Sequence, residues 1–491
     1  MGLRHRTISG VAWSSIARAG QQGVQFVVSI ILARLLVPDD FGIVGMILVF
    51  SGFARLFAEF GFSAALIQRP RIRRAHTVSV FWVNLVVGGA LTGLFYLAAP
   101  ALARFYSTPA LEPVAKAMSL SFAISSVGIV PMALLQREMR FKWLARLEIL
   151  AAATSGLLAV AMAFCGFGVW SLVANLLAGR VVSVVLAFHA TGWRPGFAYS
   201  SKAVGELLHF SAHLFGYRFI NYWARNADNL LIGRLIGSTA LGYYTRAYSL
   251  MLLPITQVIS VLTRVMFPAL SAIQDDKERV KRIYLRAMHV ITLITFPMMI
   301  GLFAVAEPFI LTLLGRQWEP VIPILRILCF VGVIQSLANP TGWIYQSQGN
   351  TRWMFWWGVG GSGALILGIW IGAMLGSVES VAWSYLVANI VTLYPCLAIP
   401  GSLIGMKVKE VMEHVSAAFV CSVVMAVVVW GIGRILPEAW PPAAYLVLQV
   451  SAGVLVYVGL VVATRPMGYR EVLQIIEDRR RQRVGLRVVA E

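Results

Sequence analysis

The sequence contains few charged residues, and this scarcity excludes an ordinary soluble protein. Asp, Glu, Lys and Arg make up 13% of the 491 residues, whereas hydrophobic residues make up 59%. Soluble globular domains carry about 25% charged residues. Apolar runs of about 20 residues, each long enough to span a bilayer, recur from end to end. The short alternating segments typical of a membrane barrel are missing. The composition therefore predicts an all-α polytopic membrane protein.

The sequence also lacks the motifs of metal sites and of ATP hydrolysis. Its four cysteines show no CxxC or metal-ligand spacing, and no Walker or Gly-x-Gly-x-x-Gly pattern lies at a strand-to-helix turn. We therefore expect no metal, no cofactor and no disulfide. Acidic residues are scarce as well, with 21 Asp and Glu against 41 Lys and Arg. In so apolar a chain, cytoplasmic loops and anionic lipid headgroups explain this positive charge, so we expect no nucleic-acid partner.

Lysine and arginine predict the orientation of the chain. Connections rich in these residues, such as 69–74 and 137–146, alternate with connections that have none, such as 37–40 and 165–168. The basic connections are expected in the cytoplasm. We predict about 14 transmembrane helices, and this even number places both termini in the cytoplasm. The predicted spans are 11–36, 41–67, 77–100, 114–135, 144–164, 168–190, 205–235, 241–270, 284–306, 321–345, 354–375, 380–402, 411–433 and 442–464.

The chain repeats itself at an offset of 200 residues. The stretch 12–42 returns as 212–242, so that Arg18 falls on Arg218 and Gly42 falls on Gly242. Later echoes continue the repeat through six spans. Because six is even, both copies insert the same way up, as two pseudo-symmetric bundles around a shared site. We predict a six-helix bundle at 1–200, a second at 201–405, and two further helices with a basic cytoplasmic tail at 406–491.

Both copies of the repeat carry polar side chains inside an apolar helix. A charged side chain at mid-membrane costs about 2.5 to 3.5 kcal/mol on insertion scales, so it normally faces a cavity or a partner. Guanidinium groups bind phosphates through paired hydrogen bonds, and amides suit sugar hydroxyls. Tyrosines such as Tyr222 could stack on sugar rings. We therefore predict a substrate-binding cavity lined by Arg18, Gln21, Gln25, Arg218, Asn221 and Arg225.

Ion pairing is the alternative role for some of these charges. Arg225 and Asp228 are three residues apart, and Arg55 and Glu59 are four apart, so each pair could neutralise itself. Asp228 and Glu59 are also the acidic residues on which proton or sodium coupling would draw. The membrane potential acting on a cationic cavity is the alternative to such coupling. Two further arginines near the outer ends of their spans are expected to snorkel or to cap a helix. These are Arg34 and Arg234.

Five sequence motifs follow one another along the chain. They are residues 33–42 (ARLLVPDDFG), 56–68 (LFAEFGFSAALIQ), 228–233 (DNLLIG), 241–244 (LGYY) and 266–270 (MFPAL). In this order they resemble the polysaccharide transporter family, the Wzx-type flippases of the multidrug/oligosaccharidyl-lipid/polysaccharide exporter superfamily. The resemblance extends over roughly residues 5 to 400 and is strongest to exporters of the colanic-acid and succinoglycan type.

The resemblance implies a fold and a function. It implies two six-helix bundles in a V-shaped transporter that flips an undecaprenyl-diphosphate-linked oligosaccharide across the bacterial inner membrane. The product would serve exopolysaccharide or O-antigen synthesis, with membrane lipids, a polymerase and other polysaccharide-assembly proteins as candidate partners. The chain would then be a transporter and no enzyme.

Two other functions compete with this expectation. A membrane polysaccharide polymerase or glycosyl ligase would act on the same lipid, but such enzymes usually need a sizeable extracytoplasmic loop, and the longest such connection, about 307–320, is short. A multidrug cation antiporter of the same superfamily would prefer an acidic cavity, whereas the polar stripes are net basic.

Overall fold

The structure, a computed structural model, is helical wherever it describes regular secondary structure. The residues that it describes are 20–59, 63, 66–67, 72–197, 199–201, 222–223, 225–435, 437 and 440–464. For residues 56–59 and 264 only the backbone is described. This helical content confirms the predicted all-α class for the described part of the chain.

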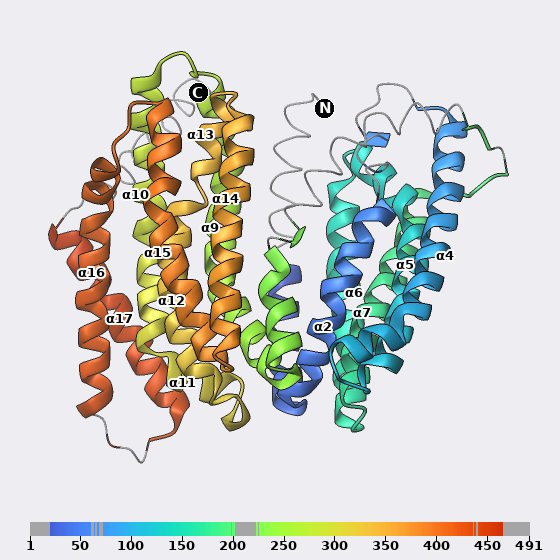
Figure 1. Cartoon of the computed structure of the whole chain (residues 1–491), viewed down its shortest axis with the longest axis horizontal. Helices are drawn as coiled ribbons and strands as arrows, with labels where there is room; N and C mark the ends of the chain where they lie inside the picture. The colour runs from blue at the N-terminus through green and yellow to red at the C-terminus, as the bar shows by residue number, and fades with distance from the viewer. Residues whose placement is uncertain are drawn as a thin grey trace, which may run out of the picture. The chain divides into compact units, whose positions relative to one another are not determined.

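Two compact units divide the chain, Met1–Gly242 and Tyr243–Glu491. In the first unit α4, α5, α6 and α7 lie side by side, and α2 packs on α4, α5 and α7 (Figure 1). Helical segments 20–35 and 225–235 and the start of α9 complete its described part. The helices of this unit are α2 (Pro38–Glu59), α4 (Arg74–Phe105), α5 (Leu111–Arg137), α6 (Phe141–Phe164), α7 (Val169–Thr191) and the first residues of α9 (Ser238–Ser271).

The second unit contains the rest of α9 and the helices that follow. In this unit α10 packs against α12 and α16, and α14 packs against α15. The last helix, α17, packs on α11 and α16. Its elements are α10 (Lys277–Ala304), α11 (Ala306–Leu313), the 3-10 turn η1 (Arg316–Trp318), α12 (Val321–Ala338), α13 (Thr341–Ser347), α14 (Thr351–Met374), α15 (Val378–Leu403), α16 (Val408–Ile435) and α17 (Pro442–Thr464).

Eleven helices in the described part are long and apolar enough to cross a membrane, with α12 and α13 together forming one of them. Each corresponds to one of the predicted spans. The other three predicted spans, 11–36, 41–67 and 205–235, include residues outside the described part. The structure therefore supports a polytopic helical membrane protein, and the total of 14 spans stays a prediction. The three predicted domains, 1–200, 201–405 and 406–491, also stay a prediction, since they follow the sequence repeat and not the packing.

Small residues let the helices of the first unit approach closely. A Cβ on Gly88 of α4 would overlap the side chain of Ser126 on α5, and a Cβ on Gly128 of α5 would lie 2.7 Å from Val184 on α7. Lipid chains are as apolar as leucine, so close van der Waals packing between small residues is a main source of helix association in membranes. These contacts hold together the helices of the first unit, which also contains Gln21, Gln25, Arg225 and Asp228 of the predicted site.

Candidate functional site

Part of the predicted cavity lies outside the described residues. Arg18, Arg218 and Asn221 fall there, and so does the side chain of Glu59, whose backbone ends α2. Their placement in a cavity therefore stays a prediction. Gln21, Gln25, Arg225 and Asp228 are described, and they belong to the first compact unit.

Gln21 and Gln25 lie on helical segment 20–35, which α6 holds in place. A Cβ on Gly156 of α6 would overlap the side chain of Val28, so the two helices touch at this point. Further along, Leu32 is buried in one apolar cluster with Ala159 of α6. Gln21 is half-buried and Gln25 is exposed. The segment thus anchors itself through apolar residues and leaves the Gln25 amide accessible to a ligand.

The two copies of the repeat contact each other at equivalent positions. A Cβ on Gly42 would overlap the backbone carbonyl of Ser238, and a Cβ on Gly242 would overlap the carbonyl of Pro38. Pro38 and Ser238 are themselves 200 residues apart, so the contact is reciprocal. The Asp39 carboxylate accepts hydrogen bonds from the hydroxyls of Ser238 and Thr239. Such reciprocity is expected of two copies related by a local two-fold axis, which supports the sequence repeat.

Arg225 and Asp228 do not form the ion pair that their spacing allows. Arg225 is exposed, whereas Asp228 is buried with 7% of its surface exposed. One Asp228 oxygen accepts a hydrogen bond of 2.8 Å from the backbone N–H of Asn229. No ion pair joins Arg225 to an acidic group within the described part of the chain. Arg225 therefore keeps its charge available, as the cavity hypothesis requires.

Tyr222 serves packing inside the first unit. Its hydroxyl donates to the backbone carbonyl of Val49 on α2, and a Cβ on Gly52 would overlap that hydroxyl. Its ring lies 6.0 Å from the ring of Phe53. With its hydroxyl and ring engaged by α2, Tyr222 is better explained as an anchor for the following segment 225–235 than as a platform for a sugar.

Arg180 is an intramembrane arginine that the repeat-based prediction omitted. It lies at the middle of α7, where it donates hydrogen bonds to the Ser125 hydroxyl (2.8 Å) and the Ser121 carbonyl (3.2 Å) of α5. An arginine at this depth normally faces a partner or a cavity. The signal was present in the sequence, because Arg180 is the one Lys or Arg well inside the predicted span 168–190.

Three further arginines are distinguished by their exposure and by their nearby partners. Arg34 and Arg234 are exposed, and the Arg234 guanidinium lies 5.5 Å from the centroid of the Phe105 ring. In the second unit Arg326 lies 3.5 Å from Glu307. The positions of Arg34 and Arg234 agree with snorkelling at span ends.

The cysteines and the acidic residues that the structure describes were the remaining candidates for metal ligands. All four cysteines are free thiols, and no group of three or more His, Cys, Asp or Glu side chains among the described residues could hold a metal ion.

Comparisons with known proteins show which family the chain resembles in sequence. The sequence profile of the polysaccharide biosynthesis protein family matches residues 31–323, more than half of the chain. A teichuronic acid biosynthesis protein, TuaB of Bacillus subtilis, is 27% identical over 96% of this chain and 98% of its own length. A succinoglycan biosynthesis transport protein, ExoT of Rhizobium meliloti, is 31% identical over 78% of each chain.

A solved structure shows the fold. The lipid II flippase MurJ in an inward closed conformation superposes with a TM-score of 0.73 over 94% of this chain and 99% of its own, at 16% sequence identity. At this identity the likeness establishes the helical fold alone. Together with the matched profile and the 31% identity to a transport protein, it confirms the family that the motifs indicated. The chain belongs to the family of polysaccharide biosynthesis proteins.

Proposed function

We propose that this protein flips an undecaprenyl-diphosphate-linked oligosaccharide across the bacterial inner membrane for the synthesis of a surface polysaccharide. One observation carries the proposal: the chain is 31% identical to a succinoglycan biosynthesis transport protein over 78% of each chain. The fold that it shares with a lipid II flippase supports the same conclusion. From the positive charge of the connections and the predicted even number of spans, we infer that both termini lie in the cytoplasm. A polymerase and other polysaccharide-assembly proteins are the partners that would receive the product.

Binding in the proposed cavity follows from the charges of the repeat. A diphosphate entering the membrane loses hydration, and fixed guanidinium groups replace part of it by charge and paired hydrogen bonds. Arg18, Arg218 and the exposed Arg225 are the groups that we assign to the diphosphate. The amides of Gln21, Gln25 and Asn221 are assigned to sugar hydroxyls. Rocking of two bundles around this site then exposes the headgroup to either side of the membrane in turn.

Asp228 is our candidate for coupling transport to a proton or sodium gradient, with Glu59 as the alternative. Asp228 is the buried acid of segment 225–235 and lies three residues from Arg225. An acidic residue inside a membrane helix is costly and commonly marks an ion pathway. We expect Asp228→Asn to abolish gradient-driven transport. Glu59→Gln is the comparison, and loss of coupling in that variant alone would favour Glu59 instead.

The two competing functions have less support. The relatives that match include a named transport protein. A cation antiporter would need an acidic cavity. In segment 225–235 the acidic Asp228 is buried, whereas the basic Arg225 is exposed, so this function has less support. We therefore favour transport of an anionic lipid-linked substrate over both alternatives.

Substitution of the paired arginines tests the proposal in cells. Arg18→Ala and Arg218→Ala are each expected to abolish polysaccharide export, because the diphosphate loses a fixed counter-charge at mid-membrane. Lipid-linked repeat units should then accumulate in the cytoplasmic leaflet, measured by extraction and mass spectrometry. Arg352→Ala, an exposed arginine at the start of α14, is the matched control and should export normally. Full export by the Arg18→Ala/Arg218→Ala double variant would contradict the proposal.

A further inference from the structure

A second group of arginines, none of them in the predicted cavity, lines a pocket where α4 begins and α5 and α7 end. Arg73 and Arg74 lie at the start of α4, and Arg194 follows the end of α7. Together with Thr77 and Trp193 they line a pocket of about 500 Å³. We call it the cationic pocket. The basic connections that form it belong to the side predicted as cytoplasmic.

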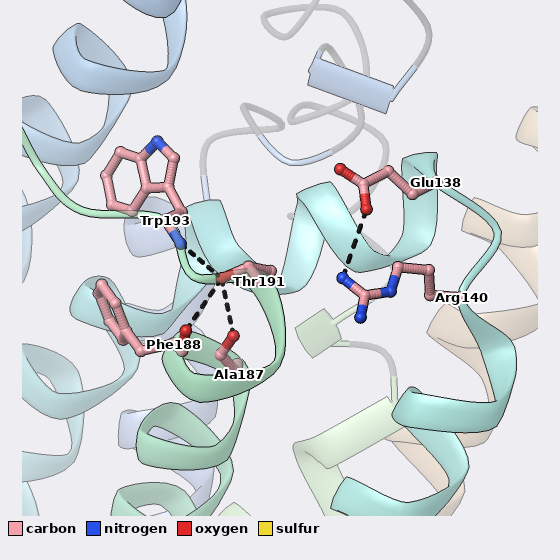
Figure 2. A network of polar contacts seen from close by, with 6 residues as sticks. All are labelled: Glu138, Arg140, Ala187, Phe188, Thr191 and Trp193. Carbon is pink, nitrogen blue, oxygen red and sulfur yellow. Dashed lines mark hydrogen bonds and ion pairs between the residues drawn. The ribbon is translucent and has the colours of Figure 1, made fainter.

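Local structure at the end of α7 holds Trp193 and Arg194 in place. The Thr191 hydroxyl donates to the Ala187 carbonyl (2.8 Å) and accepts from the Trp193 N–H (3.3 Å), as Figure 2 shows. Gly192 ends the helix with a positive φ of 63°, a conformation that favours glycine. The Trp193 ring then lies 5.4 Å from the Phe81 ring. The turn is thus determined by its own hydrogen bonds and packing.

The segment after Arg194 runs along α4, which brings the two sets of arginines together. Trp82 donates its indole N–H to the Gly196 carbonyl (2.8 Å), and the Ser200 N–H donates to the Ser79 hydroxyl (2.8 Å). The Arg74 guanidinium lies within 3.8 Å of the position that a Cβ on Gly196 would occupy. The arginines of the pocket therefore come from two chain segments about 120 residues apart that are fixed to each other.

The charge of the cationic pocket is not neutralised from within the described part of the chain. Arg73, Arg74 and Arg194 form no ion pair with a carboxylate there. Glu138 is the acidic residue of the lining, and its carboxylate lies 3.6 Å from Arg140 (Figure 2). The amino end of α4, a helix of 32 residues, adds partial positive charge. Three guanidinium groups thus face a pocket with one, already paired, carboxylate.

An apolar groove lies beside the cationic pocket and shares a chain segment with it. Phe197 and Tyr199, a few residues beyond Arg194, line a groove of about 560 Å³ together with Trp82, Val83 and Val86 of α4. Trp82 and Phe197 stack with ring centroids 5.8 Å apart. The positive charge of the cationic pocket and the apolar side chains of the neighbouring groove together suit a molecule with an anionic headgroup and an acyl chain.

We propose that the cationic pocket binds the headgroup phosphate of an anionic phospholipid in the cytoplasmic leaflet, with an acyl chain along the neighbouring groove. Arginine favours phosphate because its planar group donates two parallel hydrogen bonds, and Trp193 suits the membrane interface. The lipid is a bound regulator or structural ligand of the first unit, separate from the transported substrate. This inference does not rest on the proposed function.

Lipid retention by the purified protein tests this site. The full chain is reconstituted with phosphatidylglycerol or with phosphatidylcholine, extracted in mild detergent, and its bound lipids are counted by native mass spectrometry. Wild type should retain phosphatidylglycerol in preference to phosphatidylcholine. In the variant Arg73→Gln/Arg74→Gln/Arg194→Gln, the ratio of retained phosphatidylglycerol to phosphatidylcholine should fall roughly tenfold or more. Each basic residue near an anionic surface contributes about 1 kcal/mol to the attraction.

Two further variants make the result specific. Arg279→Gln/Arg282→Gln/Arg352→Gln removes the same charge from exposed positions in the second unit and should retain lipid as wild type does. Glu138→Gln removes the acidic group of the pocket and should raise retention, which keeps the test decisive if the triple variant folds poorly. Equal loss in both triple variants, or no change in Glu138→Gln, would overturn the proposal.

Competition identifies the ligand. Inorganic phosphate at millimolar concentration should fail to displace phosphatidylglycerol, since it lacks the acyl chain, and undecaprenyl diphosphate should not be retained in preference to phosphatidylglycerol. Displacement by phosphate alone would show a free-anion site and would overturn the lipid assignment. Preferential retention of undecaprenyl diphosphate by the Arg73, Arg74 and Arg194 side chains would show a substrate site and would overturn it too.

Discussion

Arg180 shows how a single charge is accommodated in an apolar helix. Its guanidinium crosses from α7 to α5, where it meets a serine hydroxyl and a backbone carbonyl. Hydrogen bonds to a charged group contribute about 1.5 to 3 kcal/mol, more than neutral ones. In the membrane the alternative for this side chain is an unsatisfied charge. Arg180 therefore ties two helices of the first unit together.

The Arg180→Ala variant should be less stable than wild type by about 1.5 to 3 kcal/mol, measured by thermal unfolding in detergent. Ser125→Ala removes one of the acceptors and should cost less, because the Ser121 carbonyl remains as a partner. Should both substitutions shift the melting temperature equally, or should neither do so, Arg180 would have no such role.

Spacing along the sequence was a poor guide to individual ion pairs. Arg225 and Asp228 stand at i and i+3, yet one is exposed and the other buried, and the Asp228 carboxylate bonds to the Asn229 N–H. Helical spacing brings two side chains near each other, but burial of one partner and competition from backbone groups decide whether they pair. Similarly, the sequence suggested that Tyr222 could stack on a sugar ring, and only the fold shows that its hydroxyl and ring contact α2.

At the level of elements, the duplicated first turns of α2 (38–42) and α9 (238–242) pack closely against each other. Glycine lets each backbone reach the carbonyl of the other turn, and the Asp39 carboxylate joins the contact through Ser238 and Thr239. The sequence showed that Gly42 and Gly242 were equivalent, but it could not show that the equivalent turns touch. Such a contact depends on tertiary packing that no local pattern encodes.

The Gly42→Ala and Gly242→Ala variants should each destabilise the protein by about 1 to 3 kcal/mol, because a methyl group would overlap a backbone carbonyl that has no rotamer to escape into. The controls are Gly89→Ala and Gly93→Ala on the exposed side of α4, where a Cβ meets nothing within 4 Å. These should melt at or above the wild-type temperature, since alanine favours the helix. Equal melting temperatures across all four variants would refute the contact.

Helices themselves were the most predictable elements. Apolar runs of bilayer length decide helix positions almost alone, because every backbone group must be satisfied inside the membrane. The eleven described candidate spans accordingly coincide with predicted ones. The cationic pocket was not predicted, because its arginines come from two connections that the sequence separates by about 120 residues and only the packing of segment 194–200 on α4 brings together.

At the scale of the whole molecule, composition predicted a polytopic helical membrane protein and the motifs indicated the family, and the fold and family comparisons confirm these two predictions. The repeat of six spans predicts two bundles inserted the same way up, and this division stays a prediction. The substrate cavity is less constrained. Its central residues, Arg18 and Arg218, lie outside the described part of the chain, so their roles rest on charge and depth alone.

The most direct test of the account is flipping by the purified protein in liposomes. Undecaprenyl-diphosphate-linked oligosaccharide with a fluorescent sugar is placed in both leaflets, and the fraction that an external reagent can quench is followed over time, with and without a proton, sodium or voltage gradient. Wild type should make all the lipid accessible, whereas the Arg18→Ala/Arg218→Ala variant, inserted to the same level, should leave the inner half protected. Equal rates for the variant and wild type, or no flipping by wild type under any gradient, would contradict the account.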